Sequence, residues 1–444
     1  MVGLRRRRAA VITEYARIAS TAGLYDRALP HLRALAGWEP LNERAHAWLM
    51  IALAGSSQQA EALRIYTELR ERLDDQLGIV PCAELRDAYD RVLRQEVPAS
   101  TVGAGRTAPW RPVYQLPAAP ADFTGRASES AGIEAALSPC TGRTGVPVAV
   151  VSGMPGAGKT ALALHVAHTL RPRFPDGQLW MHLAGTAARP REPGEVLADL
   201  LHELGVRASS VPQATRMRAA LFRSRLAGRK VLLVADDVAS GAQIRPLLPG
   251  TAGSAMLMTS RAPLALLNGE TTVVLGELTE AEAVRMLARI VGESRVAADP
   301  GAAVRVVRAC GRLPLAIRIA GVKLAARKRW PLSVMADRLT QQRNPMDELE
   351  IGDLSMRASI GSSYRALGQR ARQALRMLGG MGAVSCTEPV VATVLGEPDV
   401  AGVVSELVGT SLIAPSGVDG SGEPSYLIHP LVRDFAAERL ADGR

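Results

Sequence analysis

The sequence predicts a multidomain protein with an all-α N-terminal region, an α/β domain on a parallel sheet, a helical subdomain, and a C-terminal subdomain of helices with a hairpin. Three patterns predict this fold class. Apolar residues recur at helical spacing through residues 1–96. Short β-branched runs alternate with helical patterns between residues 146 and 275, which is typical of a parallel sheet. Beyond Leu278 strand patterns are rare.

The N-terminal region, residues 1–96, contains an internal repeat. Residues 23–29 are followed 34 positions later by residues 57–63, so that Ala62 takes the place of Ala28. A 34-residue period with small residues where helices pair is typical of tetratricopeptide-like helix pairs. We therefore expect a tetratricopeptide-like N-terminal domain.

A capping helix is expected over residues 81–95 and a linker over residues 97–121, because prolines stand at positions 98, 109, 112, 117 and 120. Residues 122–277 are predicted to form the α/β domain. Its strands are short apolar runs, as expected of buried parallel strands. They are expected over residues 146–151, 178–183, 230–235, 254–259 and 271–275, with helices over 159–170, 194–204 and 214–226.

The helical subdomain is predicted over residues 278–345, with helices over residues 279–292, 299–310 and 314–328. The C-terminal subdomain follows over residues 346–444, with a hairpin over residues 412–428 that turns through a glycine-rich segment. Helices with a terminal hairpin indicate a winged-helix-like subdomain.

Charge and composition exclude several classes of protein. The net charge of +10 comes from 53 basic and 43 acidic residues. The basic residues are dispersed among Asp and Glu, which favours solvated helix faces over a nucleic-acid surface. The four arginines at residues 5–8 are explained equally well by a frayed, charged terminus and by a contact with phosphate. No apolar run reaches the about 18 residues of a membrane span, and no apolar segment of a secretory signal follows these arginines.

The four cysteines are far apart in sequence and form no C-x-x-C pair, which favours reduced thiols in a cytoplasmic protein over a metal site. They are Cys82, Cys140, Cys310 and Cys386.

A P-loop motif is predicted between the first expected strand and helix, where it is in the right context. It fits G-x-x-x-x-G-K-[ST], and its glycines let backbone N–H groups surround phosphates at a helix N-terminus. Lys159 is placed to reach the β- and γ-phosphates, and Thr160 to ligate Mg²⁺. The motif predicts ATP or ADP bound at Gly153, Met154, Pro155, Gly156, Ala157, Gly158, Lys159, Thr160 and Ala161.

Two acidic residues, Asp236 and Asp237, follow the apolar run at residues 231–235. A carboxylate at the end of a parallel strand can hold the Mg²⁺ of a bound nucleotide, so Asp236 is the predicted metal ligand. Asp237 is the predicted catalytic residue, which orients or activates a water molecule. The alternative for this pair is a helix N-cap. Arg261 ends another expected strand and is a candidate contact for a γ-phosphate.

The motifs of residues 122–440 resemble those of the NB-ARC module of STAND-class signalling ATPases, and they follow one another along the chain in the same order. Phe123-Thr124-Gly125-Arg126 with Glu129 resembles the entry motif, which implies that Gly125 and Arg126 lie near the adenine. Thr259-Ser260-Arg261 resembles sensor 1. Residues 310–316 resemble the GLPLA motif, which implies that Pro314 packs on the base. Residues 426–431 resemble the MHD motif, which implies that His429 contacts the ADP β-phosphate. Pro430 replaces the usual Asp, which implies a looser off-state.

Residues 1–96 resemble the bacterial transcriptional activation domain of AfsR-like members of the antibiotic regulatory protein family. The segment Gly78-Ile79-Val80-Pro81 with Glu84 and Leu85 resembles the entry to its closing helix. The resemblance is partial, because the usual N-terminal DNA-binding domain, the first helices and the C-terminal sensor repeats are not found in the sequence. We therefore expect this chain to contact DNA only weakly or through a partner.

These features predict an ATP/ADP-binding switch in transcriptional regulation, by resemblance that of secondary metabolism, with at most slow Mg²⁺-dependent hydrolysis. Self-association or protein partners are expected through the tetratricopeptide-like domain, and no membrane contact. Two alternatives stay open: a P-loop metabolic ATPase or kinase, and a truncated nucleotide-binding remnant without regulatory output.

Overall fold

The structure is a computed structural model of the chain. It describes residues 2–21, 24–56, 58–94, 96–97, 110–138, 145–187, 189–262, 264, 269–341 and 345–443. The chain divides into two compact units, Met1–Trp110 and Arg111–Arg444, and each is described by itself.

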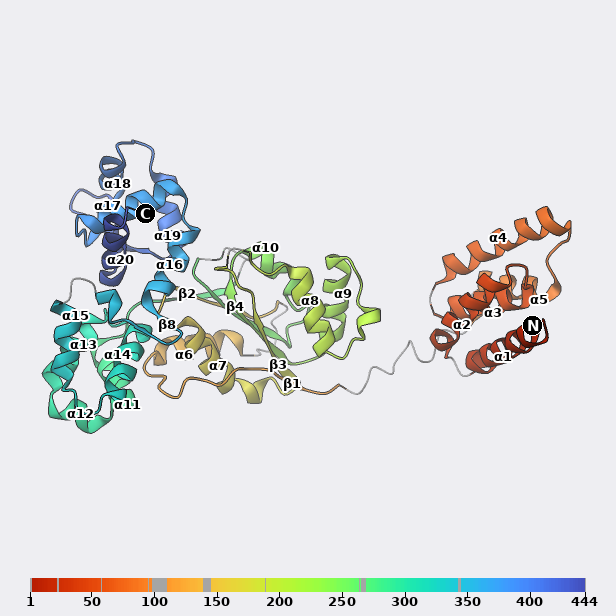
Figure 1. Cartoon of the computed structure of the whole chain (residues 1–444), viewed down its shortest axis with the longest axis horizontal. Coiled ribbons are helices and arrows are strands. Elements are labelled where there is room, and N and C mark those ends of the chain that lie inside the picture. The colour runs from red at the N-terminus through yellow and green to blue at the C-terminus, as the bar shows by residue number, and fades with distance from the viewer. Residues whose placement is uncertain are drawn as a thin grey trace. The chain divides into compact units, whose positions relative to one another are not determined.

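The N-terminal unit is helical (Figure 1). Ala28 and Ala62, at equivalent positions of the 34-residue repeat, are both completely buried. A side chain at Gly55 would overlap the Tyr25 ring, so small residues set the close approach of these helices. The helical nature of this region is confirmed, whereas the tetratricopeptide assignment stays a prediction. The helices are α1 (Val2–Thr21), α2 (Tyr25–Trp38), α3 (Glu43–Gly55), α4 (Gln59–Leu77) and α5 (Ala83–Leu93).

The second unit begins with a six-stranded sheet of order β1-β3-β4-β5-β2-β6, in which every pair of neighbours is parallel. The strands β2 and β5 are buried along their whole length, as the continuous apolar runs predict. The six strands are β1 (Val113–Tyr114), β2 (Val148–Gly153), β3 (Gly177–His182), β4 (Val231–Val238), β5 (Ala255–Ser260) and β6 (Thr271–Leu275).

Helices cover both faces of this sheet. The crossover from β2 to β3 runs in the opposite direction along the sheet from the crossover between β3 and β4. Because such crossovers are right-handed, α7 lies on one face and α8 and α9 on the other. The helices are α6 (Ala127–Leu137), α7 (Lys159–Thr169), α8 (Pro193–Glu203), α9 (Thr215–Leu226) and α10 (Gly241–Ile244), with 3-10 turns η1 (Arg171–Arg173), η2 (Ala208–Ser210) and η3 (Arg245–Leu247).

The strand β1 corrects one prediction, because it lies within the expected linker at residues 97–121. Val113 pairs with Gly177 of β3, and the Tyr114 hydroxyl donates to the Pro175 carbonyl at 3.0 Å. A linker is therefore wrong at these positions. A strand of two residues is too short to show the alternation of apolar and polar side chains that predicts strands. The prolines at 112 and 117 favour a linker instead. Prolines 98 and 109 lie outside the described residues.

The rest of the unit is mostly helical, and one continuous hydrophobic core runs from Leu278 to Ala436. A capping box of Thr279 and Glu282 begins α11. The helices that follow the parallel sheet are α11 (Glu280–Val291), α12 (Glu293–Ala298), α13 (Pro300–Ala309), α14 (Pro314–Ala326) and α15 (Leu332–Gln341). Because the core is continuous, the subdomain limits at residues 278 and 346 stay predictions.

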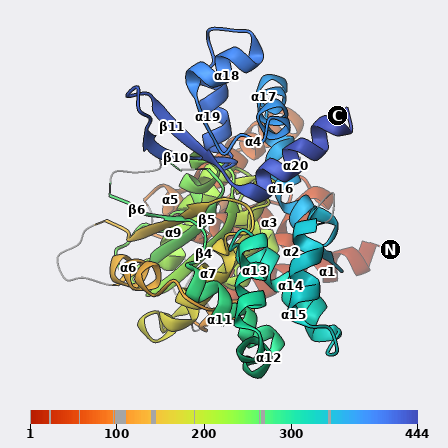
Figure 2. The same ribbon diagram turned by 90° about the vertical axis from the view of Figure 1, so that its left-hand side faces the viewer.

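A three-stranded antiparallel sheet of order β10-β11-β9 lies among the last helices (Figure 2). Ile413 pairs with Ile428, which confirms the hairpin, and the winged-helix assignment stays a prediction. The elements are η4 (Pro345–Asp347), β7 (Glu350–Ile351), β8 (Leu354–Ser355), α16 (Met356–Ala366), α17 (Gln369–Gly380), β9 (Ser385–Thr387), α18 (Glu388–Leu395), α19 (Ala401–Gly409), β10 (Ile413–Val418), β11 (Pro424–Ile428) and α20 (Pro430–Ala441).

The three cysteines that the structure describes, Cys82, Cys310 and Cys386, are free thiols. Burial raises the pKa of the Cys310 thiol to about 12 and that of Cys386 to about 11. Cys82 is half-buried and free, and Cys140 lies outside the described residues. Within the described ranges, no three His, Cys, Asp or Glu side chains gather as a metal site would require. None of the helices described is both long and apolar enough to cross a bilayer.

Candidate functional site

The turn between β2 and α7 is built from glycines that no other residue replaces easily. Gly153, Gly156 and Gly158 have φ angles of 139°, 81° and 91°, which favour glycine. A side chain at Gly153 would also overlap the Leu275 carbonyl of β6. Gly158 is the N-cap of α7. The turn therefore ends at a helix N-terminus, where free N–H groups and the helix dipole favour an anion.

Lys159, the first residue of α7, folds back over this turn. Its Nζ donates to the carbonyls of Gly153 at 2.7 Å and Met154 at 2.9 Å. Burial lowers the pKa of the Lys159 ammonium to about 7, and the Arg261 cation adds to this effect. A bound anion would therefore stabilise the charged form of Lys159.

The carboxylate of Asp236 lies beside the start of α7. Its Oδ1 accepts hydrogen bonds from Thr160 Oγ1 at 2.8 Å and Thr259 Oγ1 at 2.7 Å. Two hard oxygen ligands on neighbouring octahedral positions of Mg²⁺ lie about 3.0 Å apart. The spacing and chemistry of Thr160 and Asp236 therefore fit a magnesium ion shared with phosphate oxygens.

Asp237 has an unusual backbone conformation for a residue other than glycine, with φ of 56°. It lies at an irregularity of β4, between Ala235 and Val238. Its N–H donates to Thr259 Oγ1 at 3.0 Å. Its Oδ2 accepts from the N–H of Thr186 at 2.9 Å and from the Thr186 hydroxyl at 2.8 Å. Such strain at a polar residue is typical of functional sites.

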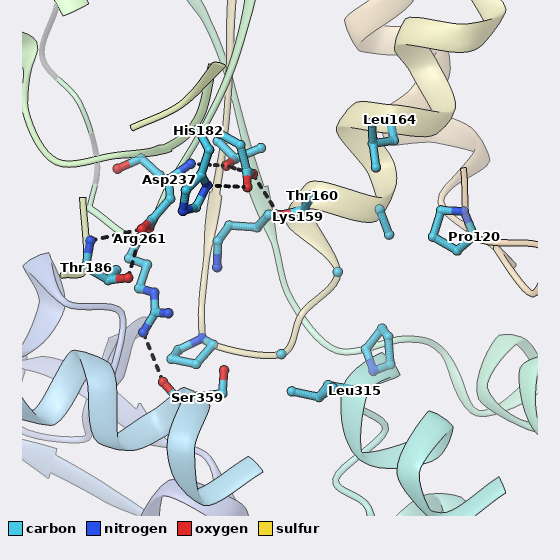
Figure 3. A pocket seen from close by; sticks show the side chains of 18 of the residues that line it. Pro120, Lys159, Thr160, Leu164, His182, Thr186, Asp237, Arg261, Leu315 and Ser359 are labelled. Carbon is cyan, nitrogen blue, oxygen red and sulfur yellow. Dashed lines mark hydrogen bonds and ion pairs between the residues drawn. The ribbon is translucent and has the colours of Figure 1, made fainter. Parts of the chain in front are cut away.

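Arg261 connects the end of β5 to the C-terminal helices. Its Nη1 donates to the Ser359 carbonyl at 2.9 Å (Figure 3). The same Nη1 donates to Ser363 Oγ at 3.0 Å, and both serines lie on α16. Ser411 Oγ in turn donates to the Arg261 carbonyl. Burial lowers the pKa of Arg261. This guanidinium therefore lies between the β2–α7 turn and α16.

These groups surround one cavity of about 470 Å³, a size common for small-molecule sites. Ten of the predicted site residues line it: Pro155, Gly156, Gly158, Lys159, Thr160, Ala161, Asp236, Asp237, Arg261 and Pro314. Most of the lining comes from the β2–α7 turn, α7, the ends of β3, β4 and β5, α14 and α16. Figure 3 shows residues of these elements, together with Pro120 and Thr186 from loops.

Two protein families match the sequence: the bacterial transcriptional activator domain over residues 1–93 and the NB-ARC domain over residues 133–296. The regulatory protein AfsR of Streptomyces coelicolor is 41% identical over 424 residues, which cover 93% of this chain and 42% of that protein. AfsR of Streptomyces griseus is 41% identical over 419 residues, with the same shares. The chain therefore contains a bacterial transcriptional activator domain followed by an NB-ARC domain and is similar to AfsR regulators.

The AfsR-like chain spans less than half the length of these relatives, 42% of each. A plant protein, the probable disease resistance RPP8-like protein 2 of Arabidopsis thaliana, is 32% identical over 193 residues, 40% of this chain and 21% of that protein. A solved STAND protein with a tetratricopeptide repeat sensor, from Pyrococcus horikoshii, has 18% identity and a TM-score of 0.36, covering 74% of this chain and 44% of that one. That likeness is too distant to bear on function.

Several predicted site residues of the AfsR-like chain do not line the cavity. Gly153, Met154 and Ala157 belong to the turn but lie outside the lining. Gly125 and Arg126 precede α6, where the Arg126 N–H donates to Glu282 Oε1 at 3.1 Å and its guanidinium donates to the Gly276 carbonyl. These contacts connect α6 to the start of α11. An adenine contact for Gly125 and Arg126 stays a prediction.

His429 also lies away from the cavity lining. Its Nε2 lies 3.0 Å from the Gly311 carbonyl and 3.5 Å from Glu277 Oε1. Its Nδ1 accepts from the Leu431 N–H at 3.1 Å, so His429 caps α20. Burial lowers the pKa of the His429 imidazole. The predicted contact of His429 with ADP stays a prediction.

The AfsR-like site includes residues that the sequence analysis did not assign to it, although Thr259 and Ser260 belong to the segment that resembles sensor 1. His182 and Thr259 lie at the carboxyl ends of β3 and β5, where ligands of open α/β sheets bind, and this rule was the available signal. His182 Nδ1 lies 3.4 Å from Asp236 Oδ2. Ser260, the last residue of β5, also lines the cavity. The remaining lining residues come from loops and helices that carry no such signal: Pro120, Leu164, Thr186, Leu315, Arg318 and Ser359.

Proposed function

We propose that this AfsR-like chain is a nucleotide-dependent switch in transcriptional regulation, which binds ATP and ADP and hydrolyses ATP slowly with Mg²⁺. The observation that carries the proposal is the shared lining of one cavity, because the P-loop turn, α14 and α16 all reach it. A nucleotide there touches three parts of the C-terminal unit at once. Control of secondary metabolism, partners of the N-terminal helices, and weak or partner-mediated contact with DNA belong to the same proposal.

Gly156 of the P-loop turn supports coupling between these parts. The Leu315 N–H, at the start of α14, donates to the Gly156 carbonyl at 3.2 Å. A Cβ at Gly156 would meet Met356 Sδ of α16 at 3.1 Å. A phosphate that moves this turn therefore also moves its contacts with α14 and α16.

Arg261 supports discrimination between ATP and ADP. Its guanidinium holds Ser359 and Ser363 of α16, and a γ-phosphate would compete for the same donors. ADP has no γ-phosphate. The two nucleotides would then differ in affinity for the arrangement in which α16 is docked, which is the condition for a ligand to shift an equilibrium.

The proposed hydrolysis assigns a role to each acidic residue. The oxygen of a water molecule forms a bond to the γ-phosphorus, and the bond from that phosphorus to the β–γ bridging oxygen breaks. The electron pair leaves on ADP, and Asp237 accepts the proton of the water. Thr160 and Asp236 would hold Mg²⁺, which supplies charge neutralisation at the phosphates. Lys159 compensates phosphate charge.

The binding part is tested by calorimetric titration of ADP. Lys159→Ala removes the buried ammonium and is expected to weaken ADP binding by about 1.5–3 kcal/mol, roughly 10- to 150-fold. Lys328→Ala is the matched control, because Lys328 is exposed and outside the cavity. Equal ADP affinity in both variants would refute the assignment of the site.

The switching part is tested by hydrogen exchange of the α16 amides. We expect faster exchange with a non-hydrolysable ATP analogue than with ADP, because the γ-phosphate competes for Arg261. Equal protection of the α16 amides with both nucleotides would contradict the switch. It would favour the alternative that the chain is a nucleotide-binding remnant without regulatory output. Fast turnover that depends on an added acceptor would instead favour a P-loop kinase or metabolic ATPase.

A further inference from the structure

The loop after β3 is attached to the end of β4 through its backbone. The Leu183 N–H donates to the Asp236 carbonyl at 2.8 Å, and the Gly185 N–H donates to the Asp237 carbonyl at 2.7 Å. A side chain at Gly185 would overlap the Asp237 carbonyl, so only glycine allows this approach. Ala184 has a φ of 51°. These contacts direct the next residue, Thr186, toward the Asp237 side chain (Figure 3).

Thr186 supplies two donors to a single carboxylate oxygen. Its N–H and its hydroxyl both bond Asp237 Oδ2, at 2.9 and 2.8 Å. Two donors at one oxygen fix the rotation of the carboxylate. Among the described residues no hydrogen bond is made to Oδ1 of Asp237, and both Thr186 and Asp237 line the cavity.

Thr259 holds the backbone of the same residue from the other side. Its Oγ1 accepts the Asp237 N–H at 3.0 Å and donates to Asp236 Oδ1 at 2.7 Å. The strained φ of Asp237 is therefore fixed by Thr259 through the main chain, while its side chain is fixed by Thr186. The two threonines act on different atoms.

We propose that Thr186 is the positioning residue of Asp237, holding Oδ2 so that Oδ1 accepts the proton of the attacking water. This inference rests on the proposed hydrolysis of ATP. It predicts that Thr186 affects the chemical step and not nucleotide affinity, because its donors are engaged with Asp237.

The test compares Thr186→Val with Thr186→Ser in the full chain, using ATP turnover and ADP titration. Valine keeps the N–H and the shape but removes the hydroxyl, whereas serine keeps both donors. We expect kcat to fall roughly 10- to 100-fold in Thr186→Val, because misplacing a reacting group costs that much. KM for ATP and Kd for ADP should stay within about threefold, because Thr186 acts on Asp237, whose proposed partner is the attacking water and not the nucleotide. Serine should restore most of kcat.

Thr169→Val is the control, since Thr169 is an exposed residue of α7 whose hydroxyl bonds its own helix at the His165 carbonyl. An unchanged kcat in Thr186→Val would overturn the role of Thr186, as would failure of serine to restore it or a loss confined to ADP affinity. Absence of ATP turnover in the unsubstituted chain would overturn the proposed hydrolysis and, with it, the role of Thr186. Turnover that is unaffected by Thr186→Val would overturn the role of Thr186 alone, so the two outcomes are distinguishable.

Discussion

Replacing Gly311 with alanine tests the contact that joins the α13–α14 turn to α20. Gly311 has a φ of 58°, and a Cβ there would overlap the imidazole of His429. The same imidazole bonds the Gly311 carbonyl and the Leu431 N–H. Alanine therefore imposes backbone strain and also displaces a buried hydrogen-bonded ring.

These two costs are separable with a second glycine. An alanine in the left-handed region costs about 1 kcal/mol, and a buried polar group that loses its partner costs about 1–3 kcal/mol. Gly311→Ala should therefore destabilise the folded C-terminal unit by about 2–4 kcal/mol. Gly396→Ala is the matched control, because Gly396 has a φ of 70° with no atom within 4 Å of an added Cβ. It carries the backbone cost alone, about 1 kcal/mol.

The assay is urea unfolding of both variants with and without His429→Ala. If the imidazole is what the new methyl group displaces, Gly311→Ala becomes milder in the His429→Ala background, with a coupling of about 1 kcal/mol or more. Additive effects, or equal destabilisation by the two glycine substitutions, would refute the reasoning. Hydrogen exchange at the Leu431 amide adds a local readout, because its acceptor is His429 Nδ1.

Three further predictions concern ligands. Burial lowers the pKa of Lys159 to about 7, and bound phosphates raise it again. ADP binding near pH 8 should therefore take up a proton, and ADP affinity should weaken by up to tenfold per pH unit as the pH rises above 7. Calorimetry in buffers of different ionisation enthalpy measures this, and Lys159→Arg should abolish the uptake, because arginine stays protonated. Asp236→Ala should remove the effect of Mg²⁺ on ATP affinity, and Asp237→Ala should lower turnover more than binding; the reverse pattern would contradict their roles. Titration with promoter and scrambled duplexes near physiological salt should show less than about a hundredfold preference, and a larger one would indicate true sequence-specific binding.

Much of the parallel sheet could be predicted because its strands are continuous apolar runs between turn residues. The expected strand over residues 271–275 coincides with β6, and the helix expected over residues 214–226 differs from α9 by one residue. The P-loop turn could be predicted as well, since its glycines mark the positions where the backbone is left-handed. In these segments the local pattern and the tertiary environment favour the same structure.

Features that depend on distant contacts could not be predicted. The strand β4 continues through Asp237 to Val238, although the acidic pair was expected to follow the strand. The irregularity there depends on Thr186 and Thr259, which lie on other elements. Arg261 was selected as a phosphate contact, yet its partner Ser359 is 98 residues away, and no local period encodes such a pair.

Pro430 shows how a departure from the family motif is accommodated. It occupies the first turn of α20, where the missing N–H of proline costs nothing. His429 Nδ1 accepts the Leu431 N–H, so this nitrogen carries no proton and Nε2 donates to Gly311. This neutral tautomer agrees with the pKa of His429, which burial lowers. Protonation would remove the cap of α20, so stability from this contact is present near neutral pH and lost as pH falls below the unfolded pKa of about 6.5. The neighbouring charges are Glu277, Arg312 and Arg433.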